Sequence, residues 1–279
     1  MEGKLKERFE IKTHVIGSKS TMSQEGKVLN RVLRRTPEGW EYEADPRHAE
    51  LIIKSLKLEE SKPVSTAGED EKEWKIEEEP EKLEGSQATE YRALAARSNY
   101  LAADRPDIQY AVKEICRGMS SPTRGGWRKL KRLGRYLVGK PRAILRYDFQ
   151  EEQGKFTGYS DSDWAGCKRT AKSTSGGIIS RGWHMIKCWS STQKSITLSS
   201  AEAELVAAVK TCTELIGVTQ LMRDWGNDTE GEVFVDPSAA IGVVHRKGNG
   251  KLRHVRVGLL WIQEKTGRMG ISCEEDTWR

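Results

Sequence analysis

The sequence predicts a mixed α/β fold that follows a mainly helical region. Three runs in its second half are typical of strands: residues 155–164, 173–182 and 183–191, with Gly182 in the turn between the last two. A helical pattern follows over residues 199–225, and then come a short apolar strand, a helix and a final strand. Strands, a helix and then alternating strand and helix are the order of elements in a mixed α/β sheet.

Ahead of this predicted sheet, the chain shows a hairpin and a series of helices. Residues 27–44 alternate apolar and polar side chains on either side of a Pro-Glu-Gly turn, as a hairpin does. One helix is predicted to begin at Asp45 and Pro46, a second at Ser86 and a third with Pro106 in its first turn. A fourth helix, rich in basic residues, precedes the sheet.

The composition is that of a globular chain. Of 279 residues, 36% are hydrophobic and 32% charged, enough for one large or two modest domains. No apolar run approaches the roughly 18 residues that span a bilayer, and the start, MEGKLKERFEIK, lacks the apolar core of a signal peptide. The five cysteines are scattered without a C-x-x-C pair, which gives no indication of a zinc or redox motif. We therefore expect an intracellular protein with no membrane partner.

Charge is distributed unevenly along the chain. Residues 59–84 hold eleven acidic and four basic side chains, a local net charge of −7 against +6 for the whole chain. Because this stretch is poor in apolar residues and is interrupted by Pro63 and Pro80, it predicts a solvated linker. Residues 124–147 are the opposite, with nine lysines or arginines and no acid.

The basic stretch predicts a helix that could contact a phosphate backbone. Its apolar residues recur at helical spacing, at Trp127, Leu130, Leu133, Leu137 and Val138, and leave other faces to the basic ones. Such a helix suits nucleic acid, with an ordinary solvated helix face as the alternative. The candidate nucleic-acid-binding residues are Arg124, Arg128, Lys129, Lys131, Arg132 and Arg135.

Two aspartates close the first predicted strand of the sheet. Asp161 and Asp163 are two residues apart, so on a strand they share a face, where like charges repel unless water, a cation or a positive side chain separates them. Another acid, Asp236, follows the short apolar strand. Because acids commonly flank strands and turns, the residues alone leave open a solvated strand end or a metal site.

Three sequence blocks follow one another in the second half of the chain: GYSDSDWAGCKRTAKSTSGGII, WSSTQKSITLSSAEAELVAAV and VDPSAAI. They resemble the RNase H domain of copia-type (Pseudoviridae) retrotransposon Pol polyproteins, and the residues before them resemble the end of the reverse transcriptase. The matching blocks run from about residue 86 to residue 266. The resemblance implies an RNase H-like mixed five-stranded sheet with flanking helices. The implied segments are 1–58, the end of the palm and thumb; 59–85, an acidic flexible linker; 86–147, a helical thumb and connection region; and 148–279, the RNase H-like domain.

The resemblance implies cleavage of RNA in RNA–DNA hybrids with two divalent cations, Mg²⁺ or Mn²⁺, held by carboxylates. Matched residue by residue, the implied metal ligands are Asp161, Glu204 and Asp236, and the implied catalytic residues are these three with His254. Asp163 and Glu202 are alternatives. Residues two apart on a helix differ by about 200° around its axis, so Glu202 and Glu204 cannot both face the site, and only the match of AELVAA favours Glu204.

The sequence departs from the family pattern in two places. In the family's His-hydrophobic-Asp motif, the position of the acid is taken here by Arg256, which would repel cations and leaves the two-metal site short of a ligand. Glu264 or an acid in CEEDTWR could replace it, although no spacing supports either. The polymerase tetrad Tyr-hydrophobic-Asp-Asp is absent from these residues, so reverse transcription would need the palm and fingers of a longer polyprotein.

Two hypotheses of different class follow from these observations. The first is a metal-dependent endonuclease that acts on RNA–DNA hybrid, and the second is a catalytically inactive, nucleic-acid-binding remnant of a retrotransposon polyprotein. The resemblance places the protein in the cytoplasm or nucleus, or within a virus-like particle.

Overall fold

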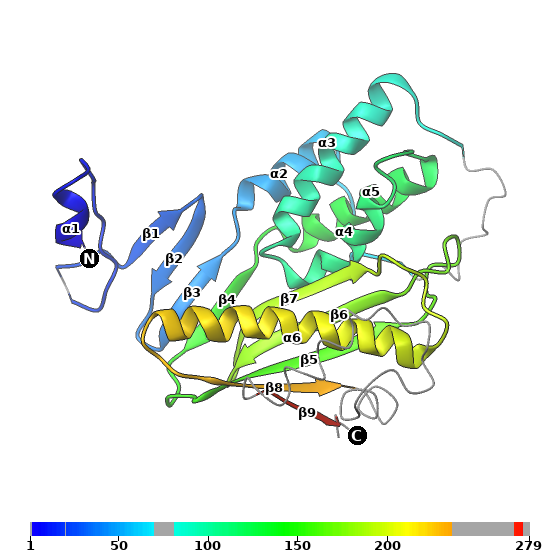
Figure 1. Ribbon diagram of the computed structural model, residues 1–279. Helices are drawn as coiled ribbons and strands as arrows, with labels where there is room; N and C mark the ends of the chain where they lie inside the picture. Colours follow the sequence, from blue (N-terminus) through cyan, green and yellow to red (C-terminus); the bar gives the residue numbers. More distant parts are fainter. Residues whose placement is uncertain (1, 20, 70–80, 236–270, 276–279) are drawn as a thin grey trace. The chain divides into compact units, whose positions relative to one another are not determined.

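The computed structural model describes residues 2–19, 21–69, 81–235 and 271–275 (Figure 1). The chain forms two compact units, each with its own sheet. The first comprises Met1–Arg105 and Pro122–Phe149, and the second comprises Pro106–Ser121 and Gln150–Arg279. These units divide the chain differently from the four predicted segments, because residues 106–121 leave the helical region and group with the sheet of the second unit.

The first unit contains an antiparallel four-stranded sheet in the order β1-β2-β3-β4. Its strands are β1 (Glu25–Val28), β2 (Arg31–Arg35), β3 (Gly39–Glu43) and β4 (Ile144–Asp148). The predicted hairpin is confirmed as β2 and β3, whose turn is closed by the Thr36 amide donating to the Gly39 carbonyl at 2.9 Å. A second hairpin, β1–β2, turns through Leu29 and Asn30 with positive φ values of 51° and 64°.

Four helices accompany this sheet in the first unit: α1 (Glu2–Lys6), α2 (Pro46–Ser55), α3 (Gly85–Ala102) and α5 (Arg124–Gly139). The predicted start of α2 is confirmed, since the Asp45 carboxylate caps it by accepting from the Arg47 amide at 3.1 Å. The basic helix α5 buries Leu130, Leu133 and Leu137, as its periodicity predicts. It ends at Gly139 because Pro141 follows closely, and the end of the basic stretch forms β4 instead.

Glu43 in β3 is a buried carboxylate held by two arginines. Its side chain is 2% exposed, Arg142 Nη2 donates to its Oε2 at 2.8 Å, and Arg34 Nη1 lies 2.6 Å from the same oxygen. The hydrogen bond from Arg142 outweighs the effect of burial and, together with that from Arg34, lowers the pKa of Glu43 from its usual value. The ion pairs tie β3 to its neighbour β2 and to the chain that follows α5.

Replacing Glu43 by glutamine is expected to lower the free energy of unfolding by about 1–3 kcal/mol at neutral pH. Because the folded-state pKa of Glu43 is lowered, its contribution is complete above the unfolded-state pKa of about 4.3 and is lost as the pH falls through the folded-state value. Urea unfolding across a pH series should therefore show the two proteins converging in acid. The control is Glu25→Gln, which removes an exposed pair with Arg34 and should change little. An equal difference at every pH would contradict this account.

The second unit contains the mixed five-stranded sheet that the sequence predicts, in the order β7-β6-β5-β8-β9. Its strands are β5 (Lys155–Asp163), β6 (Thr174–Arg181), β7 (His184–Thr192), β8 (Glu230–Val235) and β9 (Ile271–Glu275). Strands β5, β6 and β7 are antiparallel, whereas β5, β8 and β9 are parallel. This order confirms the RNase H-like fold class, and Gly182 turns between β6 and β7 with φ of 56°. The helix predicted over residues 257–267 lies outside the described residues.

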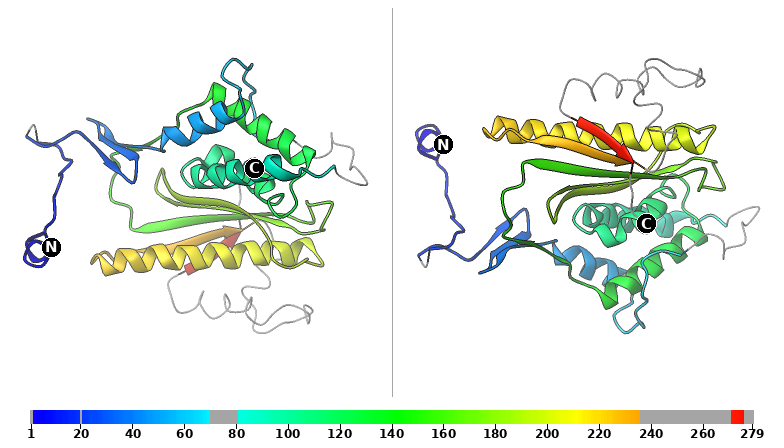
Figure 2. Two further views of the ribbon diagram at one scale, coloured as in Figure 1. Left: turned by 90° about the horizontal axis from the view of Figure 1, so that it is seen from above. Right: turned by 90° about the horizontal axis from the view of Figure 1, so that it is seen from below.

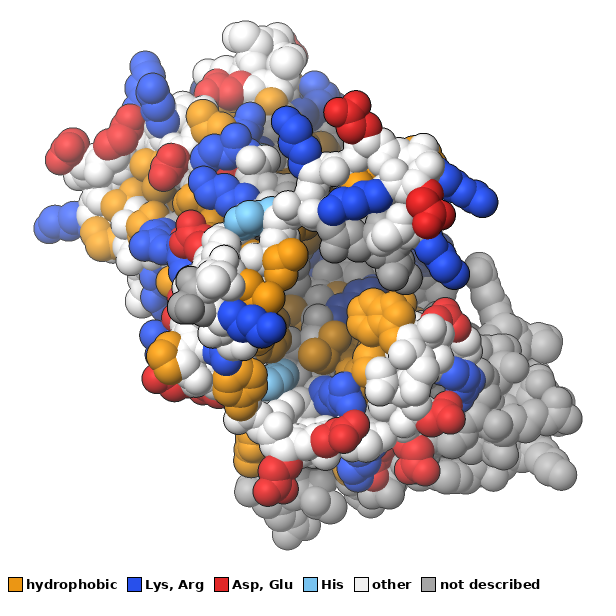
Figure 3. Space-filling model, turned by 90° about the vertical axis from the view of Figure 1, so that its left-hand side faces the viewer, with side chains coloured by type: hydrophobic (Ala, Val, Ile, Leu, Met, Phe, Trp, Pro, Cys, Tyr) orange, Lys and Arg blue, Asp and Glu red, His pale blue; other side chains and the backbone are white. Residues whose placement is uncertain are grey.

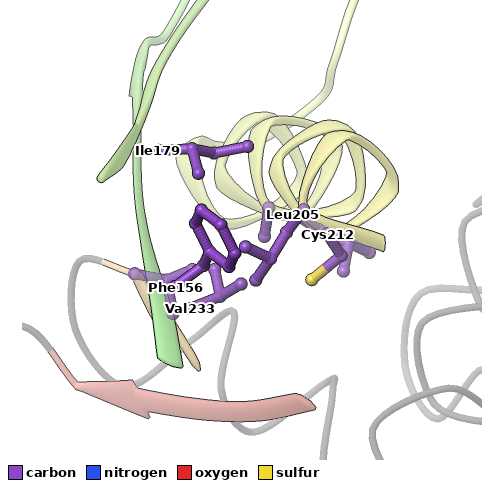
Figure 4. Packing of buried hydrophobic residues seen from close by; sticks show 8 residues of the cluster. Phe156, Ile179, Leu205, Cys212 and Val233 are labelled. Carbon is purple, nitrogen blue, oxygen red and sulfur yellow. The ribbon is translucent and has the colours of Figure 1, made fainter. Parts of the chain in front are cut away.

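A long helix, α6 (Ser200–Asp224), lies along one face of this sheet (Figures 1 and 2). Leu205 and Cys212 of α6 pack against Phe156 of β5, Ile179 of β6 and Val233 of β8 (Figure 4). By length and composition α6 is apolar enough to cross a membrane, contrary to the expectation that no segment is. Its buried residues nevertheless include those that pack on the sheet, which is the arrangement of a core helix in a soluble domain.

The second unit also includes the short helix η2 (Pro106–Ile108) and α4 (Gln109–Cys116). Gln109 donates through Nε2 to the Cys188 carbonyl of β7 at 3.2 Å, and Lys113 Nζ donates to Thr174 Oγ1 of β6 at 2.8 Å. Along β6, Ser175 and Ile179 are four residues apart and share one face, and Ile179 packs on α6. Thr174 is one residue before Ser175. Strand alternation therefore places the Lys113 contact on the face of the sheet opposite α6.

Candidate active site and nucleic-acid interface

The residues of β5 alternate between two faces of the sheet. Phe156 belongs to the core beneath α6, and a Cβ atom at Gly158 would lie 2.9 Å from Thr211 Cγ2 of that helix. The same alternation directs Ser160 and Ser162 toward α6. Asp161 and Asp163, the two aspartates of the predicted strand end, are exposed and lie on the opposite face.

Glu204 in the first turns of α6 reaches the end of β5. Its Oε1 accepts a hydrogen bond from the Ser162 hydroxyl at 2.6 Å and another from the Ser162 amide at 3.2 Å. A carboxylate oxygen with two donors from one residue is fixed in position. The structure therefore brings Glu204 to the residue that directly follows Asp161.

Glu202 has a different role, which separates the two alternatives on this helix. Its Oε2 accepts from the Leu198 amide at 2.7 Å, while its own amide donates to the Ser199 hydroxyl at 3.2 Å. Ser199 is the N-cap of α6, so Glu202 takes part in the cap of this helix and also binds the amide one residue before the N-cap. Periodicity alone could not choose between Glu202 and Glu204. The contacts give Glu202 a task in helix capping and leave Glu204 at the strand.

The third predicted carboxylate, Asp236, comes directly after strand β8 in the sequence. Val235, the last residue of β8, pairs with Ser160, the residue before Asp161. Asp236 and His254 lie outside the described residues. The topology thus brings together the ends of β5 and β8 and the first turns of α6. Asp161 belongs to β5, Glu204 belongs to α6, and Asp236 follows β8 in the sequence.

The described carboxylates do not by themselves enclose a metal ion. Asp161 and Glu204 adjoin the same stretch of β5 but approach it from opposite faces. In the parts of the chain that the structure describes, no three His, Cys, Asp or Glu side chains are grouped so as to hold a cation. A metal shared by Asp161 and Glu204 would require ligands from beyond Val235, where Asp236 follows.

The predicted basic residues of α5 differ in their surroundings. Arg124, Arg128 and Lys131 are exposed, whereas Lys129, Arg132 and Arg135 are partly buried. Arg124, Arg132 and Arg135 bond to residues between positions 62 and 81 of the same unit. The helix is therefore basic as predicted, but Arg124, Arg132 and Arg135 have partners in the described part of the acidic stretch.

A second basic surface, which we call the loop pair, was not among the predicted sites. It consists of residues 164–173, between β5 and β6, and residues 193–199, between β7 and α6. The pair contains no acid, and its basic residues are Lys168, Arg169, Lys172 and Lys194. The sequence signal for this surface is the acid-free run WAGCKRTAKSTSGG. The run lies inside one of the blocks that resemble the RNase H domain, so it was interpreted only as part of that block.

Hydrogen bonds join the two halves of the loop pair. The Trp164 indole donates to the Thr197 carbonyl at 3.2 Å, and the Ser173 and Thr197 hydroxyls lie 2.9 Å apart. Ala165 and Ala171 both have positive φ values, 53° and 51°, a conformation that alanine rarely adopts. The trace of the loop is therefore defined by its contacts, and Trp164, half exposed, is held at its surface.

Arg117, just after α4, forms hydrogen bonds with the loop between β5 and β6. Its guanidinium donates to Cys167 Sγ and, at 3.2 Å, to Thr170 Oγ1. Burial raises the pKa of the Cys167 thiol, but the hydrogen bonds from Thr170 and Arg117 outweigh it, so that the pKa is lowered overall. Lys168 and Arg169, between these anchored residues, are exposed to solvent.

Figure 3 shows one face of the protein, on which lysine and arginine side chains are interspersed with aspartate and glutamate. The positive net charge is therefore not gathered into one continuous patch on this face.

Comparison with known proteins gives several related sequences, although no family model matches the chain. The Pol polyprotein from transposon RE2 of Arabidopsis thaliana is 38% identical over 140 residues, which are 50% of this chain and 9% of that protein. An uncharacterized mitochondrial protein of the same plant is 32% identical over 61% of this chain and 68% of its own length. The Pol polyprotein from transposon TNT 1-94 of Nicotiana tabacum is 28% identical over 78% of this chain and 17% of that protein.

Among solved structures, an RNase H1 isolated from compost superposes with a TM-score of 0.34 at 15% identity, over 44% of this chain and 85% of that one. The protease–reverse transcriptase of prototype foamy virus gives a TM-score of 0.32 at 10% identity, over 46% of this chain and 19% of that one. The chain spans less than a fifth of the transposon polyproteins that it matches. The homologues of this chain thus include copia-type, retrovirus-related Pol polyproteins of transposons.

Proposed function

We propose that the second unit hydrolyses the RNA strand of RNA–DNA hybrids in a divalent-metal-dependent reaction, as one part of a longer Pol polyprotein. Sequence similarity to retrovirus-related Pol polyproteins of transposons supports this function. The single observation that carries it is the hydrogen-bonded contact of Glu204 with Ser162, beside Asp161 and beside the Ser160–Val235 pair. A carboxylate held in position at the junction of these elements has the support that a metal ligand needs.

In this proposal Asp161, Glu204 and Asp236 hold Mg²⁺ or Mn²⁺, and His254 acts near the scissile phosphate. The bound cations would activate water and stabilise the leaving oxygen. Ser162 holds Glu204 at the end of β5 through two hydrogen bonds. Asp161, exposed at the end of β5, is accessible to a phosphodiester from solvent.

The proposed partner is an RNA–DNA hybrid, contacted by α5 and by the loop pair, within a polyprotein that also supplies the reverse transcriptase palm and fingers. The exposed side chains of Lys168, Arg169 and Lys194 can neutralise phosphates, and Trp164 can stack on a base or sugar. We further propose that the protein acts in the cytoplasm, the nucleus or a virus-like particle.

The test is incubation of the purified chain with an end-labelled RNA–DNA hybrid and Mg²⁺ or Mn²⁺, with Asp161→Asn as the control. We expect metal-dependent cleavage by the parent protein and none above background by the variant. A second candidate function, a catalytically inactive nucleic-acid-binding protein, is favoured by Arg256 and by the opposite faces of Asp161 and Glu204. Hybrid binding without cleavage by either protein would establish that second function instead.

Replacing Trp164 by alanine is expected to weaken hybrid binding by about 1–3 kcal/mol, the usual contribution of an aromatic stacking contact. The matched control is Trp183→Ala, since Trp183 is 93% exposed in the turn between β6 and β7 and should leave the affinity unchanged. In the same fluorescence anisotropy titrations, Lys168→Ala should lower the salt dependence of binding by about one phosphate contact. Equal losses for both tryptophan variants would show that the loop pair has no special part in binding.

A further inference from the structure

The helix α5 is in contact with described parts of the acidic stretch that was expected to be a solvated linker. Arg132 carries most of this contact. Its Nη2 donates to the Thr66 hydroxyl at 2.8 Å, its Nε donates to the Gly68 carbonyl at 3.2 Å, and its Nη1 is paired with Glu69. The guanidinium therefore uses each of its three nitrogens for a partner within four consecutive residues.

The contact extends toward both ends of the helix. Near its C-terminus, Arg135 Nε donates to the Lys62 carbonyl at 2.9 Å, and a Cβ atom on Gly139 would lie 2.9 Å from Pro63 Cβ. At its N-terminus, Arg124 Nη2 lies 2.8 Å from Glu81 Oε1. We refer to residues 62–69 and 81–83 as the docked segment.

Backbone pairing and burial show that the docked segment is more than a set of side-chain contacts. The Leu83 amide donates to the Pro122 carbonyl at 2.9 Å, and Lys82 forms an antiparallel bridge with Thr123, the N-cap of α5. Ala67 is only 7% exposed. The expectation of a solvated linker therefore does not describe these residues, because their carbonyl and carboxylate groups find donors on the basic helix.

The acceptors around Arg132 resemble, in chemistry and placement, what a nucleic-acid backbone would offer. A carboxylate, a hydroxyl and a carbonyl stand where phosphate and sugar oxygens would bind an arginine. A guanidinium cannot satisfy both sets at once with its five donors. Lys131, which is exposed, can still meet a phosphate while the segment is docked.

We propose that the docked segment competes with nucleic acid for Arg124, Arg132 and Arg135, and so limits the affinity of α5 until an incoming strand displaces it. The proposal rests on the proposed function, since it takes α5 to be a nucleic-acid contact. Arg124 and Glu81 are both more than half exposed, and exposed ion pairs of this kind are weak enough to be exchanged. The displacement should depend on salt, because each arginine that moves from a carboxylate to a phosphate releases counterions.

The test compares two double variants with the same change in net charge. Glu69→Gln with Glu81→Gln removes both carboxylates of the docked segment, whereas Glu59→Gln with Glu60→Gln neutralises two exposed acids outside it. We expect the first pair to bind a labelled RNA–DNA hybrid about fivefold more tightly at low salt, with a salt dependence steeper by up to about two phosphate contacts. The second pair should change the affinity less than twofold. A third variant, Thr66→Val, removes an Arg132 partner without altering charge and should tighten binding by about twofold.

Each outcome decides the proposal. Equal tightening by both double variants would attribute the effect to net charge and overturn it, as would unchanged affinity for Glu69→Gln with Glu81→Gln and for Thr66→Val. If the parent protein binds the hybrid and Lys131→Ala weakens that binding, the proposed contact of α5 stands even when the competition fails. If none of the proteins binds the hybrid while circular dichroism shows them folded, nucleic-acid binding and the competition are both refuted.

Discussion

Replacing Glu204 by glutamine is expected to abolish cleavage of an RNA–DNA hybrid while leaving the melting temperature of the protein nearly unchanged. Glutamine keeps the length of the side chain and an oxygen that can accept from Ser162, so the packing of α6 on β5 should persist. What disappears is the negative charge that the proposed cation needs. The loss of a cation's stabilisation is worth several kcal/mol in the transition state, so the cleavage rate should fall at least about a hundredfold.

The matched control is Glu202→Gln, two residues earlier on the same helix. Glu202 caps α6 by accepting from the Leu198 amide, which a glutamine oxygen can also do, so its replacement should leave both the stability and the cleavage rate nearly unchanged. Single-turnover cleavage and thermal melting of the two variants separate the effects. Loss of cleavage in Glu202→Gln with normal cleavage in Glu204→Gln would reverse the assignment of the two glutamates.

Replacing Leu205 by alanine is expected to lower the free energy of unfolding by about 2–5 kcal/mol. Leu205 is completely buried between α6 and the sheet, beside Phe156 and Val233 (Figure 4). The expected loss combines the transfer free energy of the deleted methyl groups with the cavity that they leave. Urea denaturation followed by circular dichroism measures it.

Leu221→Ala on the same helix is the control for that measurement. Leu221 is 48% exposed and lies near the C-terminal end of α6, so the change should stay within about 0.5 kcal/mol. Equal destabilisation by the two variants would mean that α6 is not packed on the sheet along the face that Leu205 defines.

The elements that the sequence predicted well are those with local signals. Asp45 and Ser199 are side-chain caps, and Gly182 adopts a positive φ in a tight turn, so each marks its element by its own chemistry. The strand β4 carries no such signal, because it ends a basic stretch and pairs with β3, about a hundred residues earlier. The grouping of α4 with the second unit likewise depends on contacts with Thr174 and Cys188, which no local pattern reveals.

The candidate site was predictable in its residue types and not in its arrangement. Periodicity could not separate Glu202 from Glu204, because the two differ only in which neighbours they meet, Leu198 and Ser162 respectively. The pairing of Arg132 with Glu69 was likewise hidden, since it joins an acidic and a basic stretch that are about sixty residues apart. Contacts of long sequence separation depend on the fold and leave no periodic trace in either segment.

The measurement that tests the account most directly is calorimetric titration of Mg²⁺ into the parent protein, Asp161→Asn and Glu204→Gln. If these carboxylates share a cation at the junction of β5, β8 and α6, the parent protein should bind Mg²⁺ and each variant should lose most of that affinity. Bound metal should also raise the melting temperature of the parent protein and leave those of the variants nearly unchanged. Mg²⁺ binding of equal strength in all three proteins, or in none, would contradict a metal site built on Asp161 and Glu204.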